Sequence, residues 1–402
     1  MLTITAMQKP VTIEVRRKVN GKFLPPQWPD VQTFFQTPPQ DGIQIVFAEL
    51  NPSAGDTGSF TVPMTTDWAY PSELWEPYCW ESNGYAGSGH HIHQDGIKVI
   101  KTSWFKFLVK QLNDDSLHPR RGDEWYRYKW YEMCFYVYAV SDGTAVVFCI
   151  DTPPMFREEL MSALAANKCG PPTDASALFQ ASILAEVVKL YNTSIWSLRD
   201  SVRKLEKDRD ISGIARDRHF NFARLHDLAR HVIHTCEIVA VACDSVTEMI
   251  GDAGNNPTGS CDCSNGNSQA AKLACPHSEM AFSLRLLRNF RRRSEALKAR
   301  LTNEINLGFN LVVQQDSDSM KTIALVTLAF LPATFVSTIF SMSFFSLQFN
   351  EDTGDQDWIV SHRLWIYWAL AVPLTILTLI CWTYGQRTKS MTSLKNRHMK
   401  QS

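Results

Sequence analysis

The sequence has no excess of charge of either sign. It contains 40 lysine and arginine residues against 41 aspartate and glutamate residues, so its formal net charge is −1. A balanced chain has no overall field to attract nucleic acid, and we expect no nucleic-acid partner. Its ten cysteines are scattered rather than densely paired. That pattern favours a reducing compartment over a disulfide framework.

Catalytic motifs are also missing. The chain contains no glycine-rich nucleotide-binding loop and no nucleophile motif, so we do not expect an enzyme. Its opening residues lack an apolar core of the length found in secretory signal peptides. The last quarter of the chain instead lacks charge over long stretches, and the length of such stretches bears on whether the chain crosses a membrane.

Two long runs contain no charged residue. One lies between Lys321 and Glu351, and the other lies between Arg363 and Arg387. A helix that crosses a bilayer core of about 30 Å needs roughly 20 apolar residues, and both runs are long enough. A pair of core helices in a soluble protein is the alternative, but buried apolar runs are usually shorter. We therefore predict two transmembrane helices, at residues 321–349 and 363–385.

The charges that flank these runs predict the topology. Basic residues precede the first run and dominate the tail at 386–402. The connector at 350–362 instead carries four carboxylates, namely Glu351, Asp352, Asp355 and Asp357. By the positive-inside rule, both termini lie in the cytosol and the short acidic loop lies outside. We expect the plasma membrane, with the mitochondrial inner membrane as an alternative.

The preceding residues predict an α+β cytosolic domain, at 1–173, followed by a helical stalk at 174–320. "GIQIVFAEL", "KWYEMCFYVYAV" and "TAVVFCI" are typical of strands, and the last two form a hairpin around Asp142 and Gly143. "SWFKFLVKQL" predicts a helix, and the glycine-rich residues 83–89 predict a loop. Heptad-like apolar spacing indicates long, packed helices in the stalk, interrupted by a flexible loop at about 251–278.

Hydroxyl side chains recur on one face of the first predicted span. At about 100° per residue, Thr327, Thr334, Thr338 and Ser341 fall within a sector of roughly 60°, which also contains Met320. Such a face serves either as a helix–helix contact or as the lining of a pore with weak oxygen ligands. Two spans cannot enclose a pore, so conduction requires a symmetric oligomer. Hydroxyl oxygens suit a hydrated cation such as Mg²⁺.

The segment "MKTIALVTLAFLPATFVSTIFSMSFF" resembles the CorA family of divalent-cation channels, and especially its divergent fungal members. The matching residues are Phe330, Pro332, Thr334, Phe335, Ile339, Met342 and Phe344. The resemblance implies a homopentamer in the lipid bilayer that transports Mg²⁺ or another divalent cation and requires no cofactor. It also implies that the first span lines the pore, at Met320, Ile323, Thr327, Leu331, Thr334, Thr338 and Ser341.

The sequence departs from the family at the pore mouth. The family's Gly-Met-Asn filter is replaced here by Ser341, Met342 and Ser343. The stalk aspartate that helps to sense cytosolic Mg²⁺ in the family aligns with Asn306. Two hypotheses therefore stay open: a pentameric cation channel, or a CorA-like membrane sensor or scaffold that has lost its filter and does not conduct.

Two further clusters contain potential metal ligands. Cys261, Cys263, Cys275 and His277 have zinc-type side chains, but their spacing is not that of a standard finger. A loose, reduced loop is the interpretation that we favour. The "HHIH" cluster at 90–93 is similarly interpreted as a polar surface loop rather than a transition-metal site.

Overall fold

The computed structural model describes residues 12–49, 68–92, 98–113, 126–166, 175–212, 222–254, 275–340, 345–349 and 356–398. The chain forms two compact units, Met1–Ile305 (unit 1) and Asn306–Ser402 (unit 2). Helix α7, Pro276–Phe340, begins in unit 1 and ends in unit 2. The α+β domain and the two apolar helices that the sequence predicts are thus confirmed.

Unit 1 is built on a seven-stranded mixed sheet with the strand order β2-β1-β3-β7-β6-β5-β4. The strands are β1 Thr12–Val19, β2 Lys22–Phe23, β3 Ile43–Glu49, β4 Gly84–Ile92, β5 Val99–Asn113, β6 Arg127–Val140 and β7 Ala145–Ile150. The β3–β7 pairing is parallel, and the other pairings in this sheet are antiparallel.

The predicted hairpin between β6 and β7 is confirmed. The Asp142 carboxylate accepts a hydrogen bond from the Thr144 backbone N–H at 2.9 Å, and Gly143 has φ +95°. Glycine adopts this left-handed conformation at little steric cost, so the tight turn sets the register of the two strands. Strand β7 and residues 133–139 of β6 are buried and mostly apolar, as expected for the centre of a sheet covered on both faces.

The helix predicted for residues 103–112 is wrong, because this segment lies within strand β5. Lys106 and Lys110 are spaced by four residues and look like the polar face of a helix. Both lysines are instead buried, with 1% and 3% of their surfaces exposed. The Lys106 ammonium donates to the Trp80 carbonyl and lies 3.7 Å from the Glu132 carboxylate. Tertiary partners thus override the local pattern.

The loop predicted for residues 83–89 is also wrong, because residues 84–92 form edge strand β4. Glycine serves here to allow close packing rather than a turn. A Cβ atom on Gly87 would lie 2.6 Å from Trp104 Nε1 on the neighbouring strand β5. The Trp104 ring therefore occupies the space above a bare backbone. His90 and His91 continue in the same strand, while His93 lies outside the described residues.

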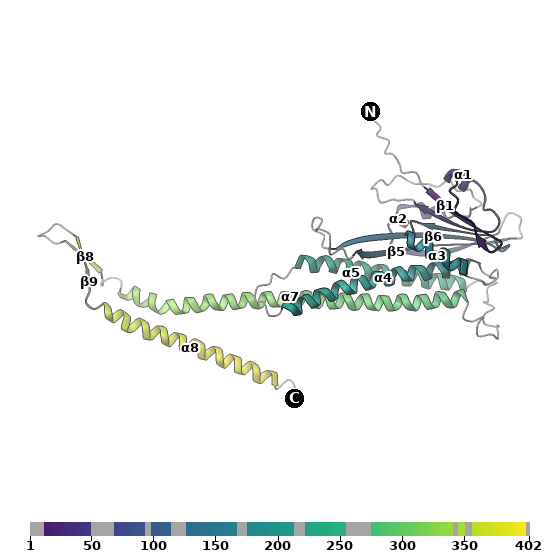
Figure 1. The fold of residues 1–402 in the computed structure, drawn as a ribbon. Coiled ribbons are helices and arrows are strands. Elements are labelled where there is room, and N and C mark those ends of the chain that lie inside the picture. Colours follow the sequence, from purple (N-terminus) through teal and green to yellow (C-terminus); the bar gives the residue numbers. More distant parts are fainter. Residues whose placement is uncertain are drawn as a thin grey trace, which may run out of the picture. The chain divides into compact units, whose positions relative to one another are not determined.

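Two hydrophobic cores cover the two faces of the sheet, and Figure 1 shows the long helices against one of these faces. One face packs Phe35 of α1 (Val31–Gln36) and Trp68 against Phe148 of β7. The short helices η3 (Ser72–Trp75) and α2 (Pro77–Glu81) follow Trp68 along the chain. The opposite face packs against α3 (Pro154–Ala166), α4 (Ala175–Ser212), α5 (Phe222–Gly254) and the first part of α7.

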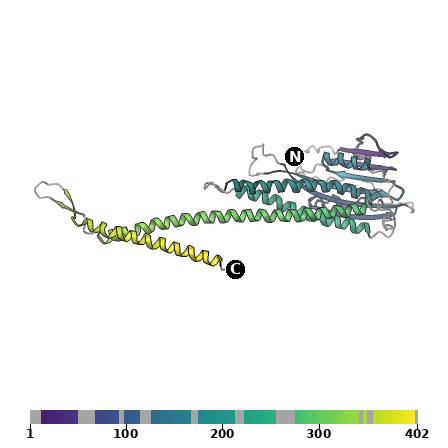
Figure 2. The same cartoon turned by 60° about the horizontal axis from the view of Figure 1, so that its bottom comes forward.

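The long helices of unit 1 lie alongside one another in both views (Figures 1 and 2). Their heptad-like positions are buried, which confirms the helical pattern of the stalk. These positions include Val188, Tyr191, Ile195, Leu198 and Val202 on α4 and Leu225, Leu228, Val232, Val239 and Val246 on α5, while Leu205 and Ile250 at the ends of the two series are half-buried. The Tyr191 hydroxyl donates to the Leu108 carbonyl at 2.9 Å, which ties α4 to β5. The connection between α5 and α7 lies outside the described residues.

Unit 2 contains the end of α7, the hairpin of β8 (Phe345–Phe349) and β9 (Gln356–Val360), and helix α8 (Leu364–His398). Both helices are long and apolar enough to cross a membrane. Only 11% and 6% of their apolar windows are buried, whereas a core helix of a soluble protein would be mostly buried. Helix α7 ends at Phe340, before the predicted limit of 349. The alternation of Phe345, Leu347 and Phe349 is that of a strand.

Candidate functional site

The predicted pore-lining positions on α7 share one property: their side chains are exposed. Met320, Ile323 and Leu331 expose 70%, 67% and 60% of their surfaces, and Thr327, Thr334 and Thr338 are also exposed. We call these six residues the α7 open face. It combines large apolar side chains with hydroxyls and carries no charge. Ser341, the remaining predicted position, lies outside the described residues.

The opposite side of α7 is covered within the chain. Pro332 and Val336 are buried. At about 100° per residue, their side of the helix lies roughly 160° from the centre of the open face. Ser337 lies between the two sides, roughly 80° from the centre of the open face, and its Oγ lies 3.2 Å from the Tyr367 hydroxyl of α8. Helix α8 therefore contacts α7 outside the open face, and Thr327, Thr334 and Thr338 are exposed within the part of the chain that the structure describes.

The hydroxyl protons of the open face are used within α7. Thr327 donates to the Ile323 carbonyl at 2.9 Å, and Thr338 donates to the Thr334 carbonyl at 2.8 Å. Thr334 shares its proton between the carbonyls of Phe330 and Leu331, at 3.1 and 2.9 Å. This back-bonding satisfies the donor of each hydroxyl. The oxygen lone pairs are acceptors, so the face offers acceptors to its surroundings.

A proline interrupts the backbone bonding beside the open face. Pro332 lies inside α7 and has no backbone N–H to donate to the Leu328 carbonyl. Proline in a membrane helix is tolerated where neighbouring groups re-satisfy the freed backbone. The Thr334 hydroxyl hydrogen-bonds to carbonyls in this same stretch of helix. In this turn the Leu328 carbonyl thus receives no hydrogen bond from residue 332, and the carbonyls of Phe330 and Leu331 accept from the Thr334 hydroxyl.

The predicted pore mouth is only partly described. Met342 and Ser343 lie outside the described residues with Ser341, and so do Glu351, Asp352 and Asp355. Asp357 lies in β9, where its backbone pairs with Gln348 of β8. The acidic connector is thus partly a two-stranded hairpin. The filter positions and the acidic cluster stay predictions from the sequence.

The candidate zinc ligands are similarly divided. Cys275 is buried and His277 is half-buried at the beginning of α7, whereas Cys261 and Cys263 lie outside the described residues. In the part of the chain that the structure describes, no group of three histidine, cysteine, aspartate or glutamate side chains is placed to hold a metal ion. Cys275 and His277 alone do not make a zinc site, because zinc sites supply at least three protein ligands.

Sequence reasoning missed a polar cluster between α5 and the sheet. Lys110 comes together there with His231 and His234, although it lies 124 residues before His234 in the chain. The spacing of Asp227, His231 and His234, at i, i+4 and i+7, places these residues on one helix face and is a signal that the sequence does contain. The lysine from β5 carried no such signal, because its segment was assigned to a helix.

Comparison with protein families gives a match over most of unit 2 and a large part of unit 1. Residues 131–383 match the model of a family described as "CorA-like Mg2+ transporter protein". A curated relative, the "Notoamide biosynthesis cluster protein M'" of Aspergillus versicolor, is 33% identical over 310 residues. The match covers 69% of this chain and 62% of that protein, so it spans less than two thirds of the relative's length.

Two solved structures have a similar fold. The CorA magnesium transporter of Methanocaldococcus jannaschii has a TM-score of 0.53 at 11% identity, with 95% of this chain and 98% of that chain covered. The full-length CmaX protein has a TM-score of 0.53 at 13% identity, with 94% and 98% covered. At this identity the likeness concerns the fold alone, but it extends over both units.

Proposed function

This chain belongs to the CorA-like Mg2+ transporter family, and on that premise we propose that it conducts divalent cations through a homopentameric pore lined by α7. The family consists of transporters of divalent cations rather than enzymes, and the chain is an integral membrane protein. Mg²⁺ is the ion that we propose first. The observation that carries the proposal is the α7 open face, which is uncovered by α8 and presents hydroxyl oxygens as acceptors.

The acceptors on this face suit a cation that keeps its water. Mg²⁺ dehydrates reluctantly and usually retains several waters in protein sites. The hydrogens of those waters point away from the ion, so they can donate to hydroxyl oxygens that line a pore. Since Thr327 and Thr338 already donate to α7 carbonyls, the coordinated waters become the donors. Each such contact is weak, which lets the ion leave as well as enter.

The exposed apolar residues below the predicted span support an oligomer. Phe309, Leu311, Val312 and Val313 are exposed on α7 within a single chain, and Val313 exposes 65% of its surface. At about 100° per residue, Phe309, Val312 and Val313 fall within a sector of roughly 100°, and an exposed apolar face of this kind is typical of a protein–protein interface. We propose that copies of α7 cover one another here, around the axis of the pore. Five copies are what the family resemblance implies.

The acidic connector supports a direction of entry. With both termini in the cytosol, Glu351, Asp352, Asp355 and Asp357 lie outside, near the pore mouth. Five copies would concentrate cations there, although salt screens much of that field. The plasma membrane is the location that we propose for this topology.

One observation favours a second function. The filter positions are Ser341, Met342 and Ser343, and serine is shorter than the asparagine of the family signature. A protein with this mouth can keep the fold and the oligomer without conducting, and would then act as a membrane sensor or scaffold. Ion flux separates the two functions directly.

The test is flux through purified protein in liposomes, with Mg²⁺, Ni²⁺, Co²⁺ and Zn²⁺ compared. We expect Thr334→Val to lower Mg²⁺ flux, because a methyl group cannot accept a hydrogen bond from a coordinated water. Thr375→Val is the matched control. Thr375 makes the same back-bond, to the Ala371 carbonyl at 2.8 Å, but lies on α8. No flux in folded pentameric wild type favours the scaffold. Equal Mg²⁺ flux in both variants would instead argue that Thr334 does not line the conducting path.

A further inference from the structure

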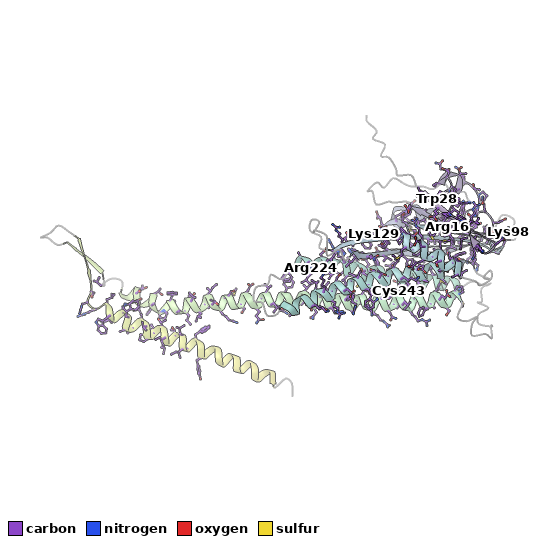
Figure 3. All side chains as sticks on the ribbon, in the orientation of Figure 1. Arg16, Trp28, Lys98, Lys129, Arg224 and Cys243 are labelled. Carbon is purple, nitrogen blue, oxygen red and sulfur yellow. The ribbon has the colours of Figure 1, made fainter. Side chains whose placement is uncertain are left out.

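A buried polar cluster lies where α5 crosses the ends of β5 and β6. Figure 3 labels Arg224, near the start of α5, and Lys129, near the start of β6, at the same end of unit 1. Arg224 Nε donates to the Tyr126 hydroxyl at 3.2 Å, which confirms that the two elements meet there. The cluster consists of Lys110, Tyr128, Trp130, His231 and His234. Nothing in the proposed transport step uses it.

Lys110 carries a buried positive charge at the centre of this cluster. Its side chain comes from β5, is 3% exposed, and places Nζ 4.2 Å from the Tyr128 ring centroid and 4.6 Å from the Trp130 ring centroid. The same atom lies 3.2 Å from His234 Nδ1. An ammonium group has donors and no acceptor, so His234 Nδ1 accepts this hydrogen bond and must be unprotonated.

His231 is buried more deeply, one turn earlier on α5. It is 1% exposed, and its ring lies 4.9 Å from the Tyr128 ring between centroids. Neither ring nitrogen has a hydrogen-bond partner among the residues that the structure describes. Buried polar groups are normally paired, so this pair of nitrogens needs an explanation. A proton is the smallest ligand that they can take.

Charges of both signs face the two rings. Lys110 comes from β5, and Arg230 comes from α5 itself. Asp227, also on α5, has a carboxylate oxygen 3.7 Å from His231 Nε2, and the same carboxylate accepts from Arg230 at 2.7 Å and from the Tyr126 backbone at 3.2 Å. Glu237 faces His234 from the next turn of α5.

Uncharged groups complete the surroundings of the two histidines. From β6 the neighbours are the Tyr128 and Trp130 rings, and from α4 the Ser194 hydroxyl donates to the Lys110 carbonyl.

These groups together oppose protonation. Burial first, and then the positive charge of Lys110, lower the pKa of His231 to about 4, against the attraction of Asp227. Burial and Lys110 also lower the pKa of His234. Both histidines are therefore neutral near pH 7 while α5 is docked.

We propose that His231 and His234 form a proton-binding site between α5 and the sheet, and that its occupation in acid loosens α5 from β5 and β6. A proton on His234 removes the acceptor of Lys110 and places a second cation 3.2 Å from its ammonium group. A proton on His231 buries a further charge beside the same lysine. Both changes are relieved when α5 moves away and the rings reach water.

The direction of the effect follows from proton linkage. Both histidines have a lower pKa in the docked form than in water, so the open form binds more protons. The docked form keeps its full stability above pH 6.5 and loses it as the pH falls from 6.5 toward 4. For His231 alone, the open fraction should rise about tenfold between pH 7.5 and pH 5.5.

Loosening of α5 would reach the base of α7. Leu228 and Val232 flank His231 along α5, and they belong to the same hydrophobic cluster as Leu297 and Leu301 of α7. Cytosolic acidification would thus weaken the packing around the helix that continues into the membrane. The proton site is independent of whether the pore conducts.

Hydrogen–deuterium exchange of the full-length protein in detergent, followed by mass spectrometry at pH 7.5 and 5.5, tests the site. After correction for intrinsic exchange rates, we expect peptides from residues 222–240 to open about tenfold more at pH 5.5, with peptides from β7 unchanged. His231→Phe should abolish most of this step, because phenylalanine keeps an aromatic ring at this position without a titrating group. His226→Gln is the matched control, since His226 is an exposed histidine on the same helix, and it should keep the step.

Lys110→Met provides a second variant if His231→Phe does not fold. Without the ammonium group, the histidines bind protons more readily in the docked form, so the pH step should shrink while the cluster stays packed. A step of wild-type size in His231→Phe or in Lys110→Met overturns the proposal. So does the absence of any step in the wild type, or an equal step in the β7 peptides.

Discussion

Ser337 on α7 and Tyr367 on α8 lie with their hydroxyl oxygens 3.2 Å apart. This hydrogen bond differs from those of Thr327, Thr334 and Thr338, whose hydroxyls bond to α7 itself. Hydroxyls in a membrane helix can contact another helix or line a polar path. The contact of Ser337 with Tyr367 is a bond to a second helix, and the lining of a path by the three threonines stays our proposal. Ser337 thus joins α7 to α8.

We expect removal of this bond to weaken the α7–α8 contact. Ser337→Ala and Tyr367→Phe should each lower stability by roughly 0.6 kcal/mol, the average for hydrogen bonds between membrane helices. The double variant should cost little more than either single one. A double-mutant cycle on the unfolding of the purified protein in detergent measures this. Fully additive effects would show that the two hydroxyls do not interact in the membrane.

We expect Ser341→Gly together with Ser343→Asn to raise the selectivity for Mg²⁺. The pair restores the Gly-Met-Asn signature of the family, and asparagine places a longer acceptor at the mouth than serine does. Competition of Mg²⁺ with Co²⁺ and Ni²⁺ in liposome flux is the measurement. Selectivity that stays unchanged in a variant with normal assembly would argue that the ions are selected elsewhere.

Val313→Asp should disrupt the oligomer while leaving unit 1 folded. Val313 is exposed in the single chain and lies among apolar neighbours on α7. A carboxylate placed at an apolar contact between copies of the helix would lose its water without gaining a partner. Native mass spectrometry should show smaller species, and the circular dichroism of unit 1 should not change. Retention of the full oligomer would exclude this surface from the interface.

Two glycine substitutions should have opposite effects on stability. Gly87→Ala places a Cβ atom 2.6 Å from the Trp104 ring, so we expect a loss of about 1–3 kcal/mol from overpacking. Gly251→Ala is the matched substitution in open space on α5, where nothing lies within 4 Å. Alanine favours a helix over glycine, by up to about 1 kcal/mol. Chemical denaturation of both variants measures the difference, and equal effects would contradict the close approach at Gly87.

The expected topology can be tested by labelling. Cysteines introduced at Thr353 and Ser393 should react with an impermeant reagent from opposite sides of the membrane, since the acidic connector and the basic tail flank the second span. Background reaction of the native cysteines is measured on the unmodified protein. Labelling from one side only would require a different number of spans.

The sequence predicted the elements that repeat a regular pattern. Tyr191, Ile195 and Leu198 recur at helical spacing, and each is buried against its neighbours. The uncharged runs that became α7 and α8 were equally clear, because charge is excluded from a bilayer core over a fixed length. In these segments one requirement, either burial at helical spacing or the exclusion of charge, applies along the whole segment, so the residue types alone are enough to predict the structure.

Prediction failed where a residue is governed by a distant partner. Lys106 and Lys110 indicate a polar helix face only if their neighbours in space are unknown. In the structure the ammonium groups of Lys106 and Lys110 hydrogen-bond to the Trp80 carbonyl and to His234, and these partners stabilise both lysines in a buried strand. Gly87 is typical of a loop in the sequence, but in the structure the Trp104 ring occupies the space that its Cβ atom would need. The hydroxyl face was predicted from its helical angle and the pore-lining positions from the family resemblance, but the acceptors of the hydroxyl protons became known only from the contacts within α7.

The back-bonds of Thr327 and Thr338 bear on anions as well as cations. An anion in a narrow polar passage needs hydrogen-bond donors, and these hydroxyls have already given theirs to the Ile323 and Thr334 carbonyls. A passage lined by this face would therefore discriminate by the sign of charge without holding a charge of its own. Chloride would face oxygen lone pairs without hydrogen-bond donors, so the passage would exclude it. The waters around a hydrated metal ion could instead donate to the same lone pairs.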